Sequence, residues 1–361
     1  MNAALAAGVV PGTGEVPAAT APCLIVNPRS FRAARGLAAR AAALAHAQGA
    51  EVVEAETPAA LHAACERILR RRQRRVIVLA GDGSVCALVD HLAAQPAGAW
   101  LPELLLLPGG RTNLIAADLR PARDALAMLA QALGPAAERH WDAALVERSA
   151  LCVEQEGAPL RHGFFVAGAA LDQIIRQVHR FREAPGGWGR GDLGFARYLA
   201  GLAAAALVGR SGIVCPTLAV DAGEGRRLAG PTRLLLVTTL RHEHGAFDPY
   251  AERGAGELRV TAIARDAKRF WRSLPRVLTG SYAAAMDTAQ GYLSGRCGRI
   301  ELRGLDAYTL DGEEHAADPA LPLVIRPGPK LRFVGHRGFG ASGRPLAASV
   351  VPGAVVPGPG R

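Results

Sequence analysis

The stretch Arg75–Val85 constrains the fold of this chain more than any other part of the sequence. Its apolar run Val76–Ala80, with three β-branched residues, predicts a buried strand. Gly81-Asp82-Gly83 ends that strand, and Ser84 is suited to cap a following helix, because apolar residues recur at helical spacing from Val85 onward. A strand, a glycine turn and a helix start direct backbone N–H groups and a helix dipole at one point, which favours an anion such as a phosphate.

Asp82 complicates a phosphate site at this turn, because a carboxylate repels a phosphate. A divalent cation between the two groups would remove the repulsion, and a carboxylate there could instead accept a proton from a substrate hydroxyl. The alternative is an Asp-Gly turn at the surface that takes no part in chemistry. The turn by itself therefore leaves both interpretations open.

The charge balance of the chain indicates acidic partners. The 361 residues carry a formal net charge of +10, almost all of it from arginine, since Lys268 and Lys330 are the only lysines. Such a balance favours nucleotides, anionic membrane surfaces or nucleic acid. Aromatic residues make up only 5% of the chain and are not interleaved with a basic stretch, so we expect no nucleic-acid partner.

Cysteine usage and hydropathy bear on where the protein is found. Six cysteines are widely scattered without a C-x-x-C pair, which is typical of reduced thiols in the cytoplasm. The first residues lack the pattern of a secretory signal, and the longest Ala/Leu-rich run, Tyr198–Val208, is too short to span a bilayer. We therefore expect a cytoplasmic protein.

Strands alternate with helices between residues 22 and 140, which predicts a doubly wound, mostly parallel sheet. The strands are expected at Cys23–Val26, Glu51–Glu54, Val76–Ala80 and Leu104–Leu107. Helices are expected at Ala33–Gln48, from Thr57-Pro58 onward, from Ser84 onward, at Leu114–Leu119 and at Pro121–Leu133. Ligands of such sheets bind at the carboxyl ends of the strands. Three of those ends carry candidate phosphate-binding turns, namely Asn27–Ser30, Gly81–Ser84 and Gly109–Asn113.

Residues 141–333 have a different sequence pattern, in which short apolar runs are separated by turns. This pattern predicts an antiparallel β domain with one or two inserted helices. The predicted strands are Ala143–Glu147, Leu151–Glu154, Gly163–Ala167, Leu234–Thr239, Glu257–Ala262, Arg299–Leu302 and Leu323–Arg326. The clearest inserted helix is Gly194–Leu207. Residues 1–21 and 334–361 are rich in Ala, Gly and Pro and are expected to be disordered tails.

A second acidic turn, Leu310-Asp311-Gly312-Glu313, follows Asp82 by about 230 residues and by itself predicts only a β-turn. Taken with the other motifs in order, it resembles the diacylglycerol kinase catalytic-domain family, which includes bacterial diacylglycerol kinases and sphingosine kinases. The matching motifs are Asn27-Pro28, Thr57, Ala80–Ser84 against G-G-D-G-T, Pro108-x-Gly110-x-x-Asn113 against P-x-G-T-x-N-D, Gly194-x-x-x-Tyr198 loosely, and Leu310–Glu313 against L-D-G-E.

The resemblance implies an ATP-dependent kinase that phosphorylates a lipid hydroxyl, with an α/β nucleotide domain, a C-terminal β-sandwich and an active site between them. It implies that Glu313 accepts the hydroxyl proton with Asp311 beside it, and that Asp82 organises magnesium and phosphates or serves as the base. The nucleotide-binding positions that it implies are Asn27, Pro28, Arg29, Ser30, Phe31, Thr57, Ala80, Gly81, Asp82, Gly83, Ser84, Val85, Cys86, Gly110, Arg111, Thr112 and Asn113. It further implies a lipid substrate met at the membrane surface and peripheral membrane association. The sequence leaves the oligomeric state open, with a homodimer as one option.

The chain departs from the family pattern at several of these positions. Phe31 stands where the family usually has glycine, Ser84 replaces threonine, and Cys86-Ala87 replaces Asn-Glu. Arg111 and Leu114 replace the threonine and aspartate of the second turn. These changes leave open a nucleotide- or lipid-binding module without catalysis. A further alternative is a small-molecule kinase of the NAD kinase type, which shares the G-G-D-G loop, although the L-D-G-E and P-x-G-x-x-N motifs argue against it.

Other candidate features have two interpretations each. The cluster Arg70–Arg75 is either a solvated helix end or a docking site for an anionic membrane. His242-Glu243-His244 is either a metal site or a solvated loop, and Asp172 either meets a substrate headgroup or favours a helix start. Trp188 is either a packing or interface residue or part of a loop that contacts a membrane.

Overall fold

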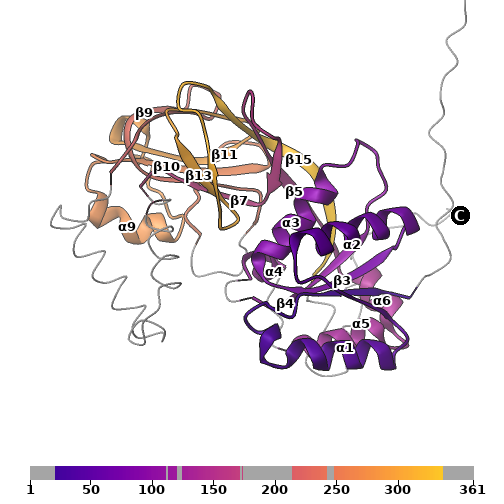
Figure 1. The fold of residues 1–361 in the computed structure, drawn as a ribbon. Coiled ribbons are helices and arrows are strands. Elements are labelled where there is room, and N and C mark those ends of the chain that lie inside the picture. Colours follow the sequence, from indigo (N-terminus) through magenta and orange to yellow (C-terminus); the bar gives the residue numbers. More distant parts are fainter. Residues whose placement is uncertain are drawn as a thin grey trace, which may run out of the picture.

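The computed structural model describes residues 21–110, 113–119, 124–170, 173, 214–241 and 248–335. Its N-terminal half is built on four parallel strands, which pair in the order β2-β1-β3-β4 (Figure 1). These strands are β1 (Cys23–Val26), β2 (Glu51–Glu54), β3 (Arg75–Ala80) and β4 (Glu103–Pro108). The helices of this half are η1 (Ala33–Arg35), α1 (Leu37–Ala47), α2 (Pro58–Arg71), α3 (Asp82–Ala93), α4 (Leu114–Asp118), α5 (Ala125–Leu133) and α6 (Ala137–Ala143).

Helices cover both faces of this sheet. Helices α2 and α3 pack on one face through side chains such as Ile68 and Leu88, while α1, α5 and α6 pack on the other through Ala41, Leu129 and Trp141 (Figure 1). Every residue of β1 and β3 is buried, which is why these strands are almost continuously apolar rather than alternating. The predicted doubly wound parallel sheet is confirmed.

The C-terminal half is an antiparallel β-sandwich, as the sequence predicted. One layer holds β5 (Leu145–Glu154), β6 (Arg161–Gly163), β8 (Thr217–Asp221), β12 (Ile300–Arg303) and the start of β15 (Leu323–Val334). The other holds β7 (Phe165–Gly168), β10 (Leu258–Ala264), β11 (Tyr292–Cys297), β13 (Ala307–Leu310) and β14 (Glu313–Ala316). Strand β9 (Arg227–Thr238) pairs with β8 along its first residues and with β10 along its last, and so joins the layers.

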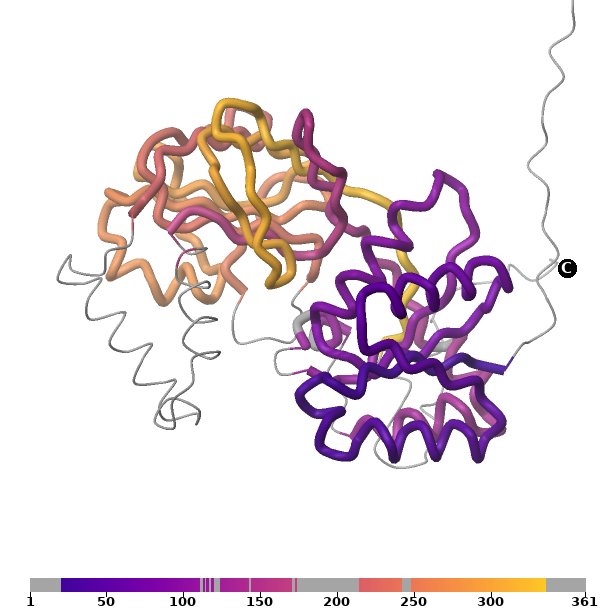
Figure 2. Tube along the Cα trace, in the orientation of Figure 1, coloured from indigo at the N-terminus to yellow at the C-terminus, as the bar shows by residue number. Residues whose placement is uncertain are grey.

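Long strands connect the two halves. β15 pairs with β12 in the sandwich, and its last part pairs with β4 in parallel, with Arg332 opposite Glu103. Figure 2 shows this yellow segment running from the sandwich into the α/β half. The rings of Phe164 and Phe333 lie 5.8 Å apart and belong to the core that also contains α3. Val334, which the sequence places in the C-terminal tail, pairs with Leu145 as the last residue of β15.

Several predicted elements have other bounds in the structure. The helix expected over residues 33–48 is divided at Gly36, whose φ of +85° suits glycine. Ser84 does not cap α3, because the helix begins earlier, at Asp82, with Gly81 as its extended N-cap residue. The strand expected to end at Arg326 continues to Val334, with a register shift after Pro327. Several elements have no counterpart in the prediction, among them α6, β8, β11, α9 (Phe270–Leu278) and η2 (Thr288–Gln290).

Some predictions fall on residues outside the described parts of the chain. These are most of both tails, the helix at residues 194–207, the Gly194-x-x-x-Tyr198 motif, Asp172, the loop around Trp188 and the His242–His244 segment. Among the helices that the structure does describe, none combines the length and the apolar character needed to cross a membrane.

Candidate active site

The turn that follows β1 is tied to the glycine turn that follows β3. Asn27 Nδ2 donates to Ser84 Oγ over 2.8 Å, and Asn27 Oδ1 accepts from the Arg29 N–H over 3.0 Å. Ser30 Oγ accepts from the Gly81 N–H over 2.9 Å. The two turns therefore lie side by side at the carboxyl edge of the sheet, where the sequence predicted them to meet.

The glycine turns after β3 and β4 pack directly against each other. A methyl group on Gly110 would lie 2.8 Å from Gly81 Cα, and one on Gly109 would lie 2.8 Å from the Ala80 backbone nitrogen. The Gly109 N–H donates to the Ala80 carbonyl oxygen over 3.1 Å. Neither Gly109 nor Gly110 has room for a side chain, which explains why glycine follows Pro108 twice in this motif.

Asn113 connects the second glycine turn to Asp82. Its side chain closes the turn, with Oδ1 accepting from the Gly110 N–H over 2.8 Å and Nδ2 donating to the Gly110 carbonyl oxygen over 3.1 Å. Its backbone N–H donates to Asp82 Oδ2 over 2.8 Å, and its φ is +50°. Asn113 thus sets the direction of the Asp82 carboxylate, while Arg111 and Thr112 lie outside the described residues.

The second acidic turn connects β13 and β14. Asp311 and Gly312 have φ values of +50° and +95°, which is the pattern of a tight two-residue hairpin turn. Asp311 Oδ2 accepts from the Phe164 N–H over 2.9 Å, and Oδ1 accepts from the Phe165 N–H over 2.8 Å. Burial raises the pKa of the Asp311 carboxyl to about 7. The observed contacts of Asp311 are therefore those of a residue that anchors the turn to β7, and its catalytic role stays a prediction.

Glu313 lies beside the first turn of α3, although the two segments are far apart in the sequence. A methyl group on Gly83 would lie 3.6 Å from Glu313 Oε1. Cys86 Sγ, one turn along α3, donates to the Asp311 carbonyl oxygen over 3.9 Å. Burial raises the pKa of this thiol, and the negative charges of Asp311, Asp82 and Glu313 raise it further. The three predicted acidic residues thus gather around the N-terminus of α3.

The other residues predicted to bind the nucleotide differ in the chemical groups that they could offer to a ligand. Ala80, Val85 and Cys86 are buried, so they offer a ligand little more than backbone. Thr57 caps α2 as predicted, with its hydroxyl oxygen accepting from the Ala60 N–H over 3.2 Å. Phe31 is 37% exposed, and the Arg35 guanidinium lies 4.2 Å from its ring centroid.

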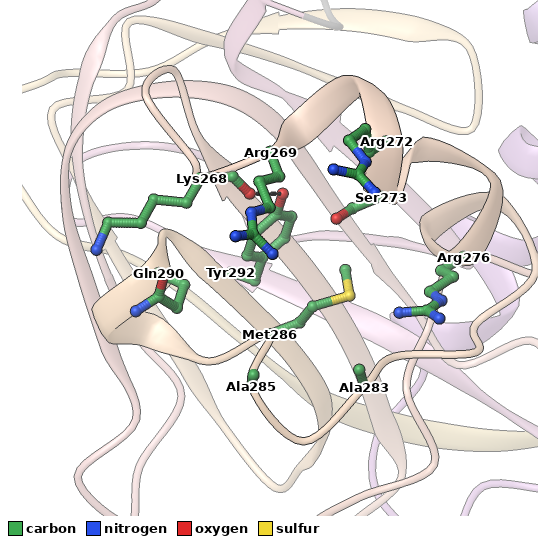
Figure 3. A pocket seen from close by; sticks show the side chains of 10 residues that line it. All are labelled: Lys268, Arg269, Arg272, Ser273, Arg276, Ala283, Ala285, Met286, Gln290 and Tyr292. Atoms are coloured by element: carbon green, nitrogen blue, oxygen red, sulfur yellow. Dashed lines mark hydrogen bonds between the residues drawn. The ribbon is translucent and has the colours of Figure 1, made fainter.

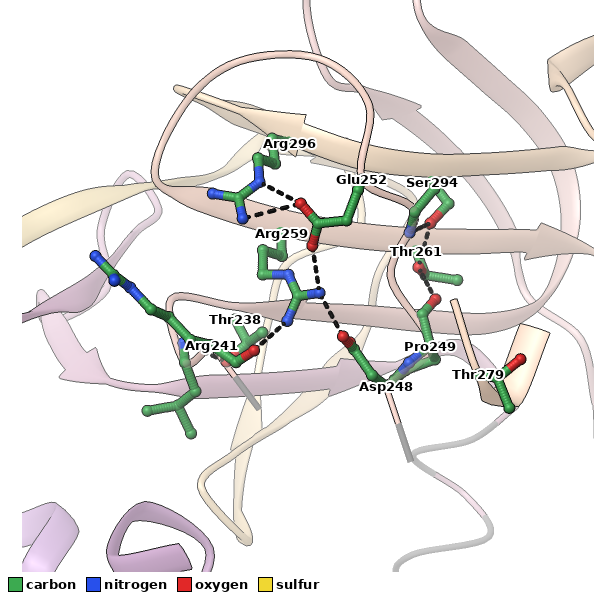
Figure 4. A network of polar contacts seen from close by, with 12 residues as sticks. Thr238, Arg241, Asp248, Pro249, Glu252, Arg259, Thr261, Thr279, Ser294 and Arg296 are labelled. Atoms are coloured by element: carbon green, nitrogen blue, oxygen red, sulfur yellow. Dashed lines mark hydrogen bonds and ion pairs between the residues drawn. The ribbon is translucent and has the colours of Figure 1, made fainter. Parts of the chain in front are cut away.

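Charged residues at the junction of the two halves were not predicted from the sequence. Asp118, at the end of α4, accepts from Arg148 Nε over 2.7 Å and from the Arg241 N–H over 2.8 Å. Arg259 donates to the Arg241 carbonyl oxygen over 2.9 Å and also pairs with Asp248 over 2.7 Å (Figure 4). These contacts attach the sandwich to the helix that follows the second glycine turn. No local sequence pattern predicts these contacts, because the two partners of each contact lie on different elements of the chain.

The described residues also contain a group that could hold a metal ion away from this site. His62 and Glu66 on α2 and His91 on α3 bring one ligand atom each to within 4.8 Å of one another. His91 Nε2 lies 3.1 Å from Glu66 Oε1, and the rings of His62 and His91 meet edge to face at 4.6 Å. At the glycine turns, the role of Asp82 toward an ATP-bound magnesium ion stays a prediction.

Together, these observations define the class of the site. A helix N-terminus suited to phosphate, an acidic side chain in its first turn and an exposed carboxylate from a second domain are parts that a phosphotransferase needs. Residues 21–144 match the family model of the diacylglycerol kinase catalytic domain. The predicted resemblance is confirmed for this part of the chain, and the match supports a kinase. No curated protein matches the chain.

Solved structures from Bacillus anthracis str. Sterne share the fold of most of the chain. A candidate diacylglycerol kinase is 14% identical, with a TM-score of 0.57 over 87% of this chain and 96% of that one. A diacylglycerol kinase is 12% identical, with a TM-score of 0.55 over 88% of this chain and 98% of that one. At such identities the likeness establishes the fold, which pairs an α/β half with a β-sandwich.

Proposed function

We propose that the protein is an ATP-dependent lipid kinase that transfers the γ-phosphoryl group to a hydroxyl of a diacylglycerol-like or sphingoid lipid. The observation that carries the proposal is the approach of Glu313 to the α3 turn that contains Asp82. Phosphoryl transfer needs positioned phosphates and one group that receives the hydroxyl proton. The two turns would supply these two requirements from opposite halves of the molecule.

The first turn of α3 would bind the phosphates of ATP. N–H groups at the start of a helix lack intrahelical partners and point outward along the axis, where the helix dipole also favours negative charge. The contacting glycine turns keep side chains away from this point, and Ser30 and Asn27 hold the neighbouring turn against it. The phosphates would therefore approach backbone atoms directly.

Asp82 fits a magnesium ion that arrives with ATP. Magnesium prefers oxygen ligands and is commonly held by one or two carboxylates together with substrate phosphates. The Asn113 N–H already directs the Asp82 carboxylate through Oδ2. When bound, the ion would neutralise part of the charge on the phosphates.

Glu313 would accept the proton of the lipid hydroxyl. Its side chain is exposed, so a substrate can reach it, whereas the neighbouring Asp311 is buried and bonded to two backbone N–H groups. Anchoring of Asp311 would hold Glu313 at the rim of the site with little freedom to move away. The lipid itself would be met at a membrane surface, with the protein attached peripherally.

The test is a kinase assay with the purified full chain, magnesium, radiolabelled ATP and either diacylglycerol in mixed micelles or a total lipid extract. We expect a labelled lipid, identified by mass, and a fall in kcat of about 10²–10⁴ in Glu313→Gln, as for loss of a general base. Glu314→Gln is the matched control, because Glu314 is the next residue along β14 and is also exposed.

Two results would contradict the proposal. Phosphorylation of NAD but of no lipid would favour the NAD kinase alternative. ATP binding without turnover on any lipid would favour a binding module, consistent with Cys86-Ala87 standing where the family has a polar pair. Full activity in Glu313→Gln would leave the lipid kinase in place but would remove Glu313 as the base.

A further inference from the structure

Helix α9 and the residues just before it concentrate positive charge beside a hollow. Lys268, Arg269, Arg272 and Arg276 line a cavity of about 630 Å³ whose floor includes Met286 and Tyr292 (Figure 3). The hydroxyl of Tyr292 donates to the Lys268 carbonyl oxygen over 2.8 Å, which ties the start of this segment to β11. All four cationic side chains are exposed. The hollow is therefore built to present positive charge to solvent.

These cations have no acidic partner within the described parts of the chain, and the cluster at the end of α2 provides a contrast. There, Arg71 pairs with Glu51 over 3.2 Å, Arg74 with Glu103 over 3.1 Å and Arg75 with Glu138 over 3.5 Å. Arg272 and Arg276 are instead one helical turn apart, a spacing at which like charges repel. A bound anion would relieve that repulsion. The α2 cluster, by contrast, is largely neutralised within the protein.

The exposed surface of α9 also carries an apolar stripe. Trp271, Pro275 and Leu278 recur at helical spacing, and Trp271 and Leu278 are 48% and 40% exposed. The opposite side of the helix is turned inward and packs against the domain through Phe270 and Val277. A short helix with a cationic stripe next to an exposed Trp/Leu stripe is typical of segments that lie in the interface of a membrane.

We propose that the α9 surface (Lys268, Arg269, Trp271, Arg272, Arg276 and Leu278) docks the sandwich half on an anionic lipid bilayer. The hollow takes the phosphate group of an anionic phospholipid, and Trp271 and Leu278 enter the boundary between headgroups and acyl chains. Two other anionic ligands fit this surface less well. A soluble phosphate would pair with the arginines but would leave the apolar stripe uncovered. A nucleic acid would likewise leave Pro275 and Leu278 exposed to water. The proposal deepens the proposed lipid kinase, since the same bilayer would present its substrate, but docking requires neither ATP nor turnover.

The test is co-sedimentation of the full chain, without ATP, with phosphatidylcholine vesicles that contain or lack phosphatidylglycerol. We expect binding only to the anionic vesicles, and a loss of at least about thirty-fold in the partition coefficient of Arg272→Glu/Arg276→Glu, since each basic residue near such a surface contributes about fivefold. Trp271→Ala should also weaken binding, but by a smaller factor. Thermal melting checks that each variant is folded.

The matched control is Arg70→Glu/Arg72→Glu, which makes the same change in net charge at the end of α2 and should bind the vesicles nearly as well as the wild type. Equal loss in both double variants, or retained binding in Arg272→Glu/Arg276→Glu, would overturn the proposal. Binding of an oligonucleotide through Arg272 and Arg276, without vesicle binding, would also overturn it. Activity on a short-chain lipid in micelles should survive in the α9 variant, which separates failure of docking from failure of the kinase.

Discussion

Two Asp-Gly turns meet at the candidate active site, and they differ in where the aspartate is held. Asp82 opens a helix, with its Oδ2 bonded to the Asn113 N–H over 2.8 Å. Asp311 is buried in a hairpin turn, and both of its carboxylate oxygens accept backbone N–H groups of β7 or the residue just before it. The same dipeptide therefore begins a helix in one half of the molecule and forms an anchoring hairpin turn in the other.

Under the proposed function, exposure rather than residue type would separate the reactive carboxylate from the structural one. Asp311 has no oxygen without a backbone donor, whereas Glu313, two residues later, is exposed at the rim of the site. If this division is correct, substitutions at Asp82 should damage catalysis, and substitutions at Asp311 should damage stability first.

The largest expected effect is on turnover in Asp82→Asn. If Asp82 positions the magnesium and phosphates as proposed, loss of its negative charge should lower kcat/KM for ATP by about 10²–10³, as for removal of one preorganised electrostatic group. Steady-state kinetics with varied ATP would measure this loss, and the urea midpoint should change little. Asp306→Asn is the control, because Asp306 is an exposed aspartate of the sandwich. Unchanged kinetics in Asp82→Asn would remove the proposed difference between the two turns.

The next effect is on folding in Asp311→Asn. An amide can accept through only one oxygen, so the N–H of Phe164 or Phe165 would lose its partner in a buried place. The free energy of unfolding should fall by about 1–3 kcal/mol, measured by urea denaturation at pH 8, where the carboxyl of the wild type is ionised and both of its oxygens accept. Activity of the fraction that remains folded should fall far less than in Asp82→Asn. A variant as stable as the wild type would show that these hydrogen bonds do not hold the turn.

The smallest expected effect is the dependence of folding stability on pH. Burial raises the pKa of Asp311 from its ordinary value of 3.8 to about 7, so the folded state binds this proton more tightly than the unfolded state. Its contribution to stability is fully present below about pH 4 and is lost as the pH rises through about 7. The wild type should therefore gain stability relative to Asp311→Asn between pH 8 and pH 5. Urea midpoints of both proteins across this range would test it, and parallel pH profiles would contradict it.

Much of the α/β half could be predicted because its signals are local. Cys23–Val26 and Glu51–Glu54 are strands with the expected bounds, and α2 starts after Thr57 and Pro58 as their capping pattern indicated. The errors arise where tertiary packing overrides a local signal. Ser84 has the side chain of a cap residue, but it bonds to Asn27 while α3 begins at Asp82. Similarly, Pro327 does not end β15, because pairing with β5 resumes beyond it.

The sequence by itself determined the two-part architecture and the motifs of the candidate site, since hydrophobic period, glycine turns and capping residues act over a few positions. Only the tertiary structure decided that Glu313 lies beside Gly83, and that Asp311 is engaged on both oxygens. It also decided that Arg71, Arg74 and Arg75 meet acidic partners, whereas the exposed arginines of α9 line a cavity. Charge pairing and burial depend on residues far apart in the chain, so no local pattern carries them.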